Sequence, residues 1–440
     1  MPVTFRERLN SPEGRTSIFY LTLFMAMGVS NPYLPIWLVD KGISESAIGT
    51  ISAAPILVVV VLTMLVGRIA DRAKDWRTVI VAGAVFAGGV PLGLYFVDGY
   101  WGVLIVWTAM MVPFQAIAPV VDAAALRMTR RHGTDFGRVR VWGTIGFILA
   151  TIIGGFFLGW YGAAAFVTMI VVLSLARAAT ALQLPYFREE NDLFRAPPAL
   201  TIPESVPGDV PLPLPPPPPP PPARGRRARA NPKIATTMKQ TWQLWYVLPL
   251  VGVALLHGSH MLQMGFGALI WQRAGIPPEI IGPLWAVAPT SEIVIMLYFA
   301  RIARRFSARH LLLFCCAAGV VRWCGFALEP GIWGLAALQA LNLATMGMSF
   351  LGAVNFIANW TSEEIAAESQ SVAVVFRQIT SVAVLVGSGF LVAWFGAGAF
   401  WASAALAALA GLCIIGSLIL MPPSEEQAAV NATHPRGDPK

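Results

Sequence analysis

Two opposite charges within long apolar stretches give this sequence its clearest chemical signal. Asp122 lies in the apolar run that begins at Trp101, and Arg140 lies in the run that ends near Leu158. The basic segment 127–138 between them is expected to form a short hairpin that faces water. Charged side chains at the depth of lipid hydrocarbon are costly, and they persist where they face a bundle interior or a wet cavity, usually with a partner. The sequence therefore predicts that Asp122 and Arg140 pair across neighbouring helices.

The residues that follow Arg140 indicate what this face could bind. Arg140, Gly143, Thr144 and Phe147 have the i, i+3, i+4, i+7 spacing that places side chains on one face of a helix. A cation, a flat glycine floor and an aromatic wall would suit a small anion that carries a ring. Asp122 would hold Arg140 in place and compete with such a substrate for it. The alternative is a structural ion pair that only locks two helices together.

Two more charges lie within apolar runs farther along the chain. Glu292 is near the middle of one run and Arg322 lies within the next. Buried charges of opposite sign on successive helices are a candidate pair for proton-linked switching. The alternative is again a buried pair with a purely structural role.

His257 and His260 are the third candidate group. They are three residues apart, so on a continuous helix they share one face, about 20 Å from the helix start at 1.5 Å per residue. Histidine titrates near neutral pH, which suits a proton carrier. The alternative is that both are hydrogen-bonded packing residues. No third ligand lies near them in the sequence, so a metal site is not expected.

The elements that must position these residues are membrane spans. The chain has 440 residues, of which 56% are hydrophobic and only 12% are charged, a composition typical of a membrane protein. About twelve apolar runs are long enough to cross a bilayer. They fall near 17–39, 46–66, 77–97, 101–125, 139–158, 161–183, 244–270, 279–300, 309–328, 332–358, 368–392 and 395–421.

The distribution of charge predicts how these spans are oriented. The net charge of +8 could suggest a nucleic-acid partner, but the basic residues gather in alternate loops. One set of loops carries most of the arginines, whereas the opposite set holds only Lys41 and Arg273. Because cytoplasmic loops carry the excess of Lys and Arg, both termini are expected in the cytoplasm of a multi-pass inner-membrane protein. Nucleic acid is therefore not an expected partner.

A repeat divides the chain into two halves. Gly42-Ile43, Ile48-Gly49 and Arg68-Ile69-Ala70 recur 233 residues later as Gly275-Ile276, Ile281-Gly282 and Arg301-Ile302-Ala303. Two six-span halves in the same orientation are typical of transporters built from parallel repeats. We expect an N-terminal bundle at 1–186, a disordered proline-rich cytoplasmic linker at 187–240, a C-terminal bundle at 241–422 and a disordered tail at 423–440. The linker's proline run, 215–222, favours an extended polyproline conformation, either as a passive tether or as a docking site.

Several motifs resemble known transporters. The stretch Gly67-Arg-Ile-Ala-Asp71-Arg72 resembles the Gly-x-x-x-Asp-Arg signature of the major facilitator superfamily, in which the aspartate is thought to brace helix ends and gate movement. Asp122, Arg140 and the segment 142–147 are similar to the helix 4–5 region of the 3-phenylpropionate permease group and, more distantly, of lactose permease. The first group is also similar at helices 7–9, through His257-Gly-Ser-His260, Trp271-Gln272, Leu284-Trp285, Glu292 and Val321-Arg322-Trp323.

The sequence also departs from lactose permease. Asn342 and Thr345 match the His and Glu that serve proton coupling on its helix 10, and neither of them titrates. Phe147 stands where that permease has a sugar-stacking tryptophan. Lactose is therefore not the expected substrate, and a proton site would lie elsewhere.

The resemblance implies an all-α membrane protein with twelve transmembrane helices in two pseudo-symmetric six-helix bundles. It implies a proton-coupled symporter of a small organic solute such as an aromatic carboxylate, working as a monomer among membrane lipid by alternating access. A nucleoside or sugar permease and a non-transport receptor or scaffold are the alternatives; no enzyme motif, cofactor or metal is expected. The expected sites are substrate binding by Asp122, Arg140, Gly143, Phe147, Trp285 and Arg322, proton coupling by His257, His260 and Glu292, and gating by Gly67, Asp71 and Arg72.

Overall fold

Helices make up the regular structure of the part of the chain that can be described. The computed structural model describes residues 10–188, 241–303 and 305–421, and every regular element in them is helical. The predicted tail 423–440, and the predicted linker except for Phe187 and Arg188, lie outside these residues. The boundaries of the two halves therefore stay a prediction.

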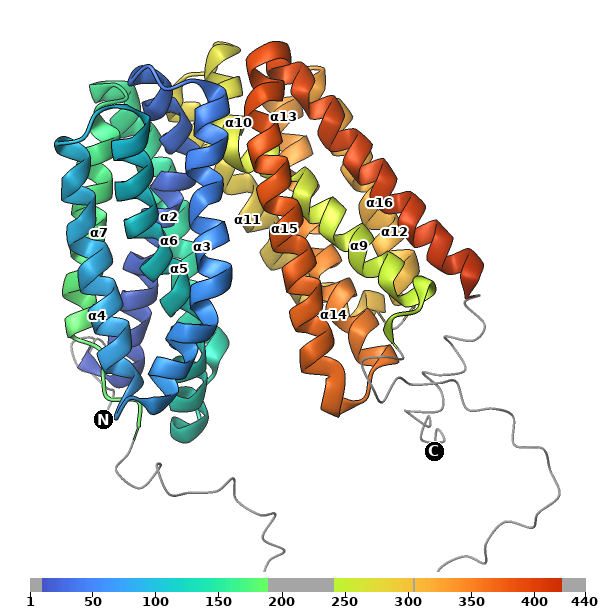
Figure 1. Cartoon of the computed structure of the whole chain (residues 1–440), viewed down its shortest axis with the longest axis horizontal. Coiled ribbons are helices and arrows are strands. Elements are labelled where there is room, and N and C mark those ends of the chain that lie inside the picture. The colour runs from blue at the N-terminus through green and yellow to red at the C-terminus, as the bar shows by residue number, and fades with distance from the viewer. Residues whose placement is uncertain (1–9, 189–240, 304, 422–440) are drawn as a thin grey trace, which may run out of the picture.

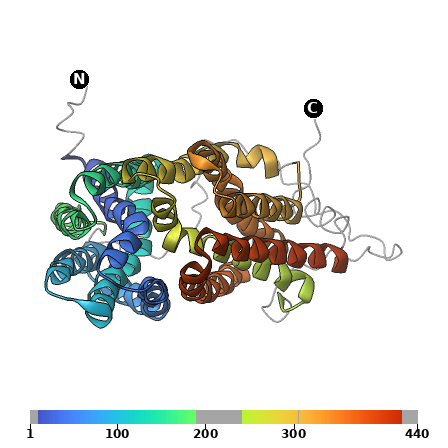
Figure 2. The same cartoon turned by 90° about the horizontal axis from the view of Figure 1, so that it is seen from above.

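The helices form two bundles that lie side by side (Figures 1 and 2). The first contains α2 (Pro12–Asp40), α3 (Glu45–Arg72), α4 (Trp76–Gly89) with the 3₁₀ segment η1 (Val90–Tyr95), α5 (Gly99–His132), α6 (Phe136–Tyr161) and α7 (Ala165–Leu182). The second contains α9 (Leu244–Ser259), α10 (Met261–Arg273), α11 (Pro278–Ala303), α12 (Ala308–Ala327), α13 (Gly331–Ala340), η2 (Leu343–Met348), α14 (Ser349–Trp360), α15 (Glu363–Phe395), the 3₁₀ segment η3 (Gly396–Ala399) and α16 (Phe400–Leu420).

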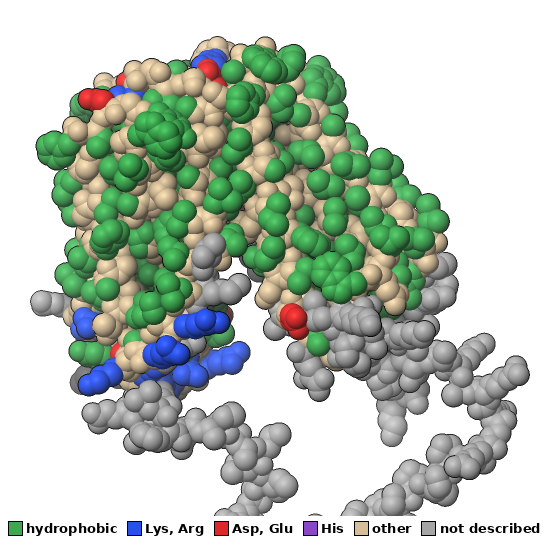
Figure 3. All heavy atoms as spheres, viewed as in Figure 1, with side chains coloured by type: hydrophobic (Ala, Val, Ile, Leu, Met, Phe, Trp, Pro, Cys, Tyr) green, Lys and Arg blue, Asp and Glu red, His purple; other side chains and the backbone are tan. Residues whose placement is uncertain are grey.

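Length and polarity suit these helices to a membrane. Nine stretches of the described residues are long and apolar enough to cross one, and the longest of them, Glu368–Leu420, covers most of α15 and all of α16. Large apolar side chains cover the outside of both bundles (Figure 3), and Ile105, Val172 and Leu412 are each more than half exposed. A soluble monomer rarely exposes so much apolar surface. The sides of the bundles are therefore suited to hydrocarbon.

The turn between α5 and α6 places Asp122 and Arg140 on antiparallel neighbours. Helix α5 continues to His132 and ends at Gly133, whose φ of 67° is a left-handed conformation that glycine adopts without strain. Helix α6 then starts from Asp135, whose Oδ1 accepts a hydrogen bond from the Gly137 amide at 2.8 Å. The expected hairpin is present, but it is only a tight turn, and the basic residues around it belong to the helix ends.

The two bundles touch at one end and separate at the other (Figure 1). At the first end α3 lies against α15 and α6 lies against α11, and we call this contact the seam. Helix backbones approach each other closely at glycines of the seam. A Cβ on Gly49 would lie 2.7 Å from the Leu385 carbonyl oxygen, and a Cβ on Gly282 would lie 2.6 Å from the Thr151 carbonyl oxygen. The ion pair of Arg273 with Glu45 also crosses the seam.

The opposite end carries the arginines. The first bundle exposes a basic cluster there, and the surface is hollowed between the bundles (Figure 3). Exposed members of the cluster are Arg68, Arg72, Arg127, Arg130 and Arg138. We call this the arginine-rich end. The space between the bundles is thus closed at the seam and open toward the arginine-rich end.

Candidate functional site

Asp122 and Arg140 meet as the sequence predicts. The Nε of Arg140 on α6 lies 3.4 Å from the Oδ1 of Asp122 on α5. The Tyr20 hydroxyl of α2 donates to the same Asp122 oxygen at 2.6 Å. The guanidinium of Arg140 also lies over two rings of α2, 4.3 Å from the centre of Phe24 and 5.3 Å from that of Tyr20. The ion pair is therefore held between three helices.

This ion pair is not sealed inside the bundle. The side chain of Arg140 is 32% exposed and that of Asp122 is 48% exposed. A pair sealed inside the bundle would be almost fully covered by protein, as Arg322 of the second bundle is at 0% exposed. The guanidinium can thus be reached from outside the bundle while two rings and a carboxylate fix its position.

The face that follows Arg140 differs from the sequence-based expectation. Gly143 is buried, and a Cβ there would lie 2.8 Å from the Phe24 ring and 2.9 Å from Arg140 Nη1. Gly143 therefore makes room for Phe24 rather than providing an open floor. Phe147 is half-buried and packs against the core. The ring beside the cation is Phe24, which sequence reasoning missed; its i, i+4 spacing from Tyr20 was the available signal.

In the second bundle Arg322 is completely buried in a polar network. Its Nη1 donates to Asn342 Oδ1 at 2.7 Å and to Thr345 Oγ1 at 3.0 Å. Its Nη2 donates to Gln263 Oε1 at 2.9 Å and to Gln339 Oε1 at 2.7 Å. A charge removed from water needs such compensation. The acceptors come from α10, α13 and the α13–η2 region, so Arg322 joins these elements to α12.

Glu292 reaches this network through an intermediate residue. The Asn342 amide nitrogen donates to Glu292 Oε1, while the Asn342 oxygen accepts from Arg322. The expected pair is thus bridged by an amide. Asn342 and Thr345 lie at η2, where the helix widens into a π turn, a feature frequently found at functional sites.

His260 lies at the other end of the same network. Its Nδ1 is 2.9 Å from the Leu256 carbonyl oxygen and its Nε2 is 2.9 Å from Thr345 Oγ1. The carbonyl can only accept, so Nδ1 carries a proton and, in the neutral ring, Nε2 accepts from the Thr345 hydroxyl. A continuous chain of hydrogen bonds therefore runs from Glu292 through Asn342, Arg322 and Thr345 to His260.

The two histidines have different surroundings. Helix α9 ends at Ser259 and α10 begins at Met261, so the span is interrupted at His260. His260 is buried beside Trp323, with the ring centres 4.9 Å apart. His257 is half-buried on the last turn of α9. His260 thus belongs to the Arg322 network.

The remaining expected site residues lie apart from these two groups. Trp285 is 5% exposed and packs edge-on against Trp271, 5.7 Å between ring centres. Gly67 and Arg72 lie on the last turns of α3, at the arginine-rich end, and a Cβ on Gly67 would meet nothing within 4 Å. Asp71 belongs to the same helix, but its side chain lies outside the described structure.

A buried acid near that end was missed by sequence reasoning. Asp75 is 6% exposed and follows α3 directly. Its Oδ1 accepts from the Arg77 amide at 2.7 Å, and its Oδ2 accepts from the amides of Phe187 and Arg188 at 2.9 and 2.7 Å. Asp75 thus caps α4 and fastens the chain that leaves α7 to the α3–α4 turn.

Comparison with known proteins identifies the family. The family model described as "MFS_1 like family" matches residues 14–417. The chain belongs to the MFS_1 like family. This membership and the helical architecture confirm the predicted all-α fold of a major facilitator transporter.

Relatives of this MFS_1 like chain are named as transporters. A probable 3-phenylpropionic acid transporter of Escherichia coli (strain K12) is 27% identical over 406 residues, covering 88% of this chain and 93% of that protein. A maltose permease of Geobacillus stearothermophilus is 26% identical, covering 86% and 84%. The crystal structure of the nucleoside transporter NupG has a TM-score of 0.72 at 14% identity, covering 94% and 99%. The chain is therefore a multi-pass membrane transporter of the MFS kind.

Proposed function

We propose that this MFS transporter carries a small organic solute together with a proton, and that the preferred solute is an aromatic carboxylate. The observation that carries the proposal is the partly exposed Arg140, fixed between Asp122 and the rings of Tyr20 and Phe24. A carboxylate would bind the guanidinium through charge-assisted hydrogen bonds. A ring on the same solute would contact Phe24. The E. coli relative named for 3-phenylpropionic acid supports this substrate class.

Transport would proceed by alternating access. The bundles are closed at the seam and open at the arginine-rich end (Figure 1). The excess of arginine supports a cytoplasmic location for that end and for both termini, in the inner membrane. The structure would then be the inward-facing state. Gly67, Asp71 and Arg72 would gate the opposite state, in which the arginine-rich ends of the bundles meet.

Proton coupling would use the network in the second bundle. A proton on Glu292 would remove the negative charge that Asn342 contacts, and a proton on His260 would remove the acceptor that Thr345 uses. Either change would alter the links between α11, η2 and α10. His257 would be a further carrier on α9. Proton and substrate together would favour reorientation of the bundles, which is a shift of population between two states.

Trp285 and Arg322 would contribute to binding from the second bundle. Both are buried in this structure, so Arg322 would act here through the network rather than by touching the solute. Phe147 and Gly143 would shape the first-bundle side, Gly143 by admitting Phe24 beside Arg140. The chain would work as a monomer in lipid, without a cofactor.

Binding and uptake measurements on reconstituted protein test the substrate. Arg140→Gln should weaken binding of 3-phenylpropionate roughly 10- to 100-fold, because a hydrogen bond to a charged group contributes about 1.5–3 kcal/mol. Arg138→Gln, at an exposed position two residues earlier on the same helix, is the matched control and should bind normally. Unchanged carboxylate binding by Arg140→Gln would refute the assigned role.

Uptake driven by a pH gradient tests the coupling. Glu292→Gln should lose uptake driven by the gradient yet retain exchange of substrate across the membrane, since exchange needs no net proton movement. If no aromatic acid, sugar or nucleoside shows gradient-dependent uptake by the unaltered protein, the coupling proposal fails.

A nucleoside or sugar permease is the second candidate. The maltose permease relative and the fold of the nucleoside transporter favour it. In that case nucleosides or sugars, rather than aromatic acids, would compete in the binding assay. A receptor or scaffold is tested separately by deleting 196–230, because a transporter should retain uptake without this segment.

A further inference from the structure

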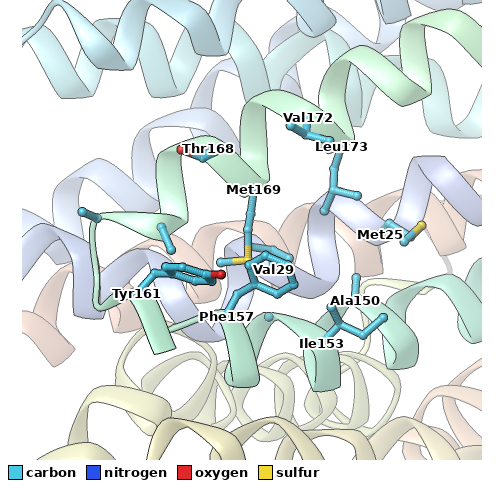
Figure 4. Close-up of a pocket in the computed structure, with 13 residues that line it drawn as sticks. Met25, Val29, Ala150, Ile153, Phe157, Tyr161, Thr168, Met169, Val172 and Leu173 are labelled. Atoms are coloured by element: carbon cyan, nitrogen blue, oxygen red, sulfur yellow. The ribbon is translucent and has the colours of Figure 1, made fainter. Parts of the chain in front are cut away.

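An apolar crevice opens on the side of the first bundle, between α6 and α7 (Figure 4). Both helices pack on α2 but make little contact with each other, so the gap between them has α2 as its floor. The volume is about 580 Å³. Val29 of α2 forms the buried floor, Ala150 of α6 is buried beside it, and Phe157 and Met169 approach each other across it.

The lining of this crevice does not suit water. Its described lining residues carry no charge, and its polar groups are the hydroxyls of Tyr161 and Thr168 near the seam end. The Thr168 hydroxyl already lies 2.9 Å from that of Tyr95. Val172 is 57% exposed and Phe157 is 40% exposed at the rim. The crevice thus opens sideways, at positions where a membrane protein meets lipid.

The length of the crevice matches one leaflet. Along α6 it extends from Ala150, near the middle of the helix, to Tyr161 at its seam end. Eleven residues at 1.5 Å each give about 16 Å, roughly half of the ~30 Å hydrocarbon core. The crevice therefore runs from mid-membrane to the interface on the seam side.

The second bundle has an equivalent crevice of about 330 Å³ between α15 and α16, over α10. Lining residues of the two crevices correspond at the spacing of 233 that marks the internal repeat. The corresponding pairs are Val29 and Leu262, Gly154 and Gly387, Met169 and Ala402, Val172 and Ala405, and Leu173 and Leu406. Because the halves are parallel repeats, both crevices face the same leaflet. Crevices at equivalent places in both bundles show that the gap follows from how two helices pack on a third span: α6 and α7 on α2, and α15 and α16 on the span formed by α9 and α10.

We propose that each crevice is a binding site for one acyl chain of a phospholipid from the leaflet on the seam side. The apolar lining, the sideways opening and the one-leaflet length all fit a lipid chain. The headgroup would lie level with Tyr161 and the exposed Trp160, where aromatic residues are favoured at the interface. Since no charged residue lines either crevice, the sites recognise the chain and not the headgroup.

Photolabelling of the full-length protein in lipid nanodiscs tests this proposal. The probe is phosphatidylcholine with a diazirine in one acyl chain, and labelled peptides are mapped by mass spectrometry. A diazirine at the chain end should label near Ala150 and Leu173, and one close to the carbonyl should label near Tyr161. The reverse order would overturn the proposed orientation of the chain.

Matched substitutions fill one crevice at a time. Val172→Phe should abolish most labelling of the first crevice and leave the second unchanged, and Ala405→Phe should do the opposite. Leu175→Phe, on α7 and 44% exposed but outside the crevice, should change neither. The untouched crevice in each variant reports that the protein is folded.

Three results would overturn the proposal. Labelling spread evenly over all lipid-facing helices would show ordinary boundary lipid only. Labelling that neither substitution reduces would show that the crevices are not occupied. Strong preference for phosphatidylglycerol over phosphatidylcholine would show that the headgroup is recognised instead of the chain.

Discussion

Replacing Gly389 with alanine should drive the protein out of the arrangement seen here. Gly389 lies on α15 at the seam, against the start of α3. An added Cβ would lie 2.8 Å from Ser46 Cα and would also overlap the Glu45 carbonyl oxygen. Carbon atoms in contact are normally about 3.5–4.0 Å apart. The obstructing atoms belong to backbone, so no side-chain rotation can relieve the overlap.

The size of the effect follows from this overlap. An extra methyl group in a well-packed contact costs about 1–3 kcal/mol. If the cost applies only while the seam is closed, the ratio of the two transport states changes by roughly 5- to 150-fold. The favoured state is the one in which the seam opens and the arginine-rich ends of the bundles meet.

Distances between spin labels measure this change. Thr134, in the α5–α6 turn, and Gln370, on α15, are exposed positions on opposite sides of the open space at the arginine-rich end. Gly389→Ala should increase the population with a short distance between these labels. Gly387→Ala is the matched control, because it lies on the same helix and its Cβ would meet nothing within 4 Å.

The reasoning would be refuted if Gly389→Ala, purified and folded, gave the same distance distribution as the unaltered protein. It would also be refuted if Gly387→Ala shifted the distribution equally, since the effect would then not arise at the seam.

Three further predictions concern single hydrogen bonds or ion pairs. Asn342→Leu removes the bridge between Glu292 and Arg322 and should destabilise the protein by about 1.5–3 kcal/mol, seen as a lower thermal midpoint; an unchanged midpoint would contradict the bridging role. Glu45→Gln breaks a partly exposed seam ion pair that contributes about 0.2–1 kcal/mol. The shift in spin-label distance should therefore be smaller than the shift caused by Gly389→Ala. A larger shift for Glu45→Gln would contradict this ranking. Tyr20→Phe removes a donor to the Asp122 carboxylate, so the carboxylate should hold Arg140 more tightly. Binding of 3-phenylpropionate should then weaken about fivefold, for a loss of roughly 1 kcal/mol. Tighter binding would show that Asp122 does not compete with the substrate.

Membrane residence, the repeat and the first ion pair could be read from the sequence because each depends on local pattern. Apolar runs of sufficient length become membrane helices whatever their neighbours are. Asp122 and Arg140 lie on successive antiparallel helices joined by a tight turn, so their contact depends on few other parts of the fold. The stretch from Gly67 to Arg72 was likewise visible as a short motif, and its gating role stays a prediction.

The partners of these residues depended on which helices pack together. Phe24 and Tyr20 come from α2, more than a hundred residues before Arg140, and the sequence did not show that α2 reaches both Asp122 on α5 and Arg140 on α6. The break at His260 and the π turn at η2 interrupt runs whose sequence pattern predicts continuous helices.

Sequence by itself determined that this chain forms membrane helices in two repeated halves, with an ion pair in the first, because hydrophobic length, charge bias and helical spacing act locally. Only the tertiary structure decided that Asn342 separates Glu292 from Arg322, that glycines bring the bundles together at the seam, and that a crevice opens at an equivalent place on each bundle. Those features arise from contacts between segments far apart in the chain, and their geometry is fixed by how whole helices pack.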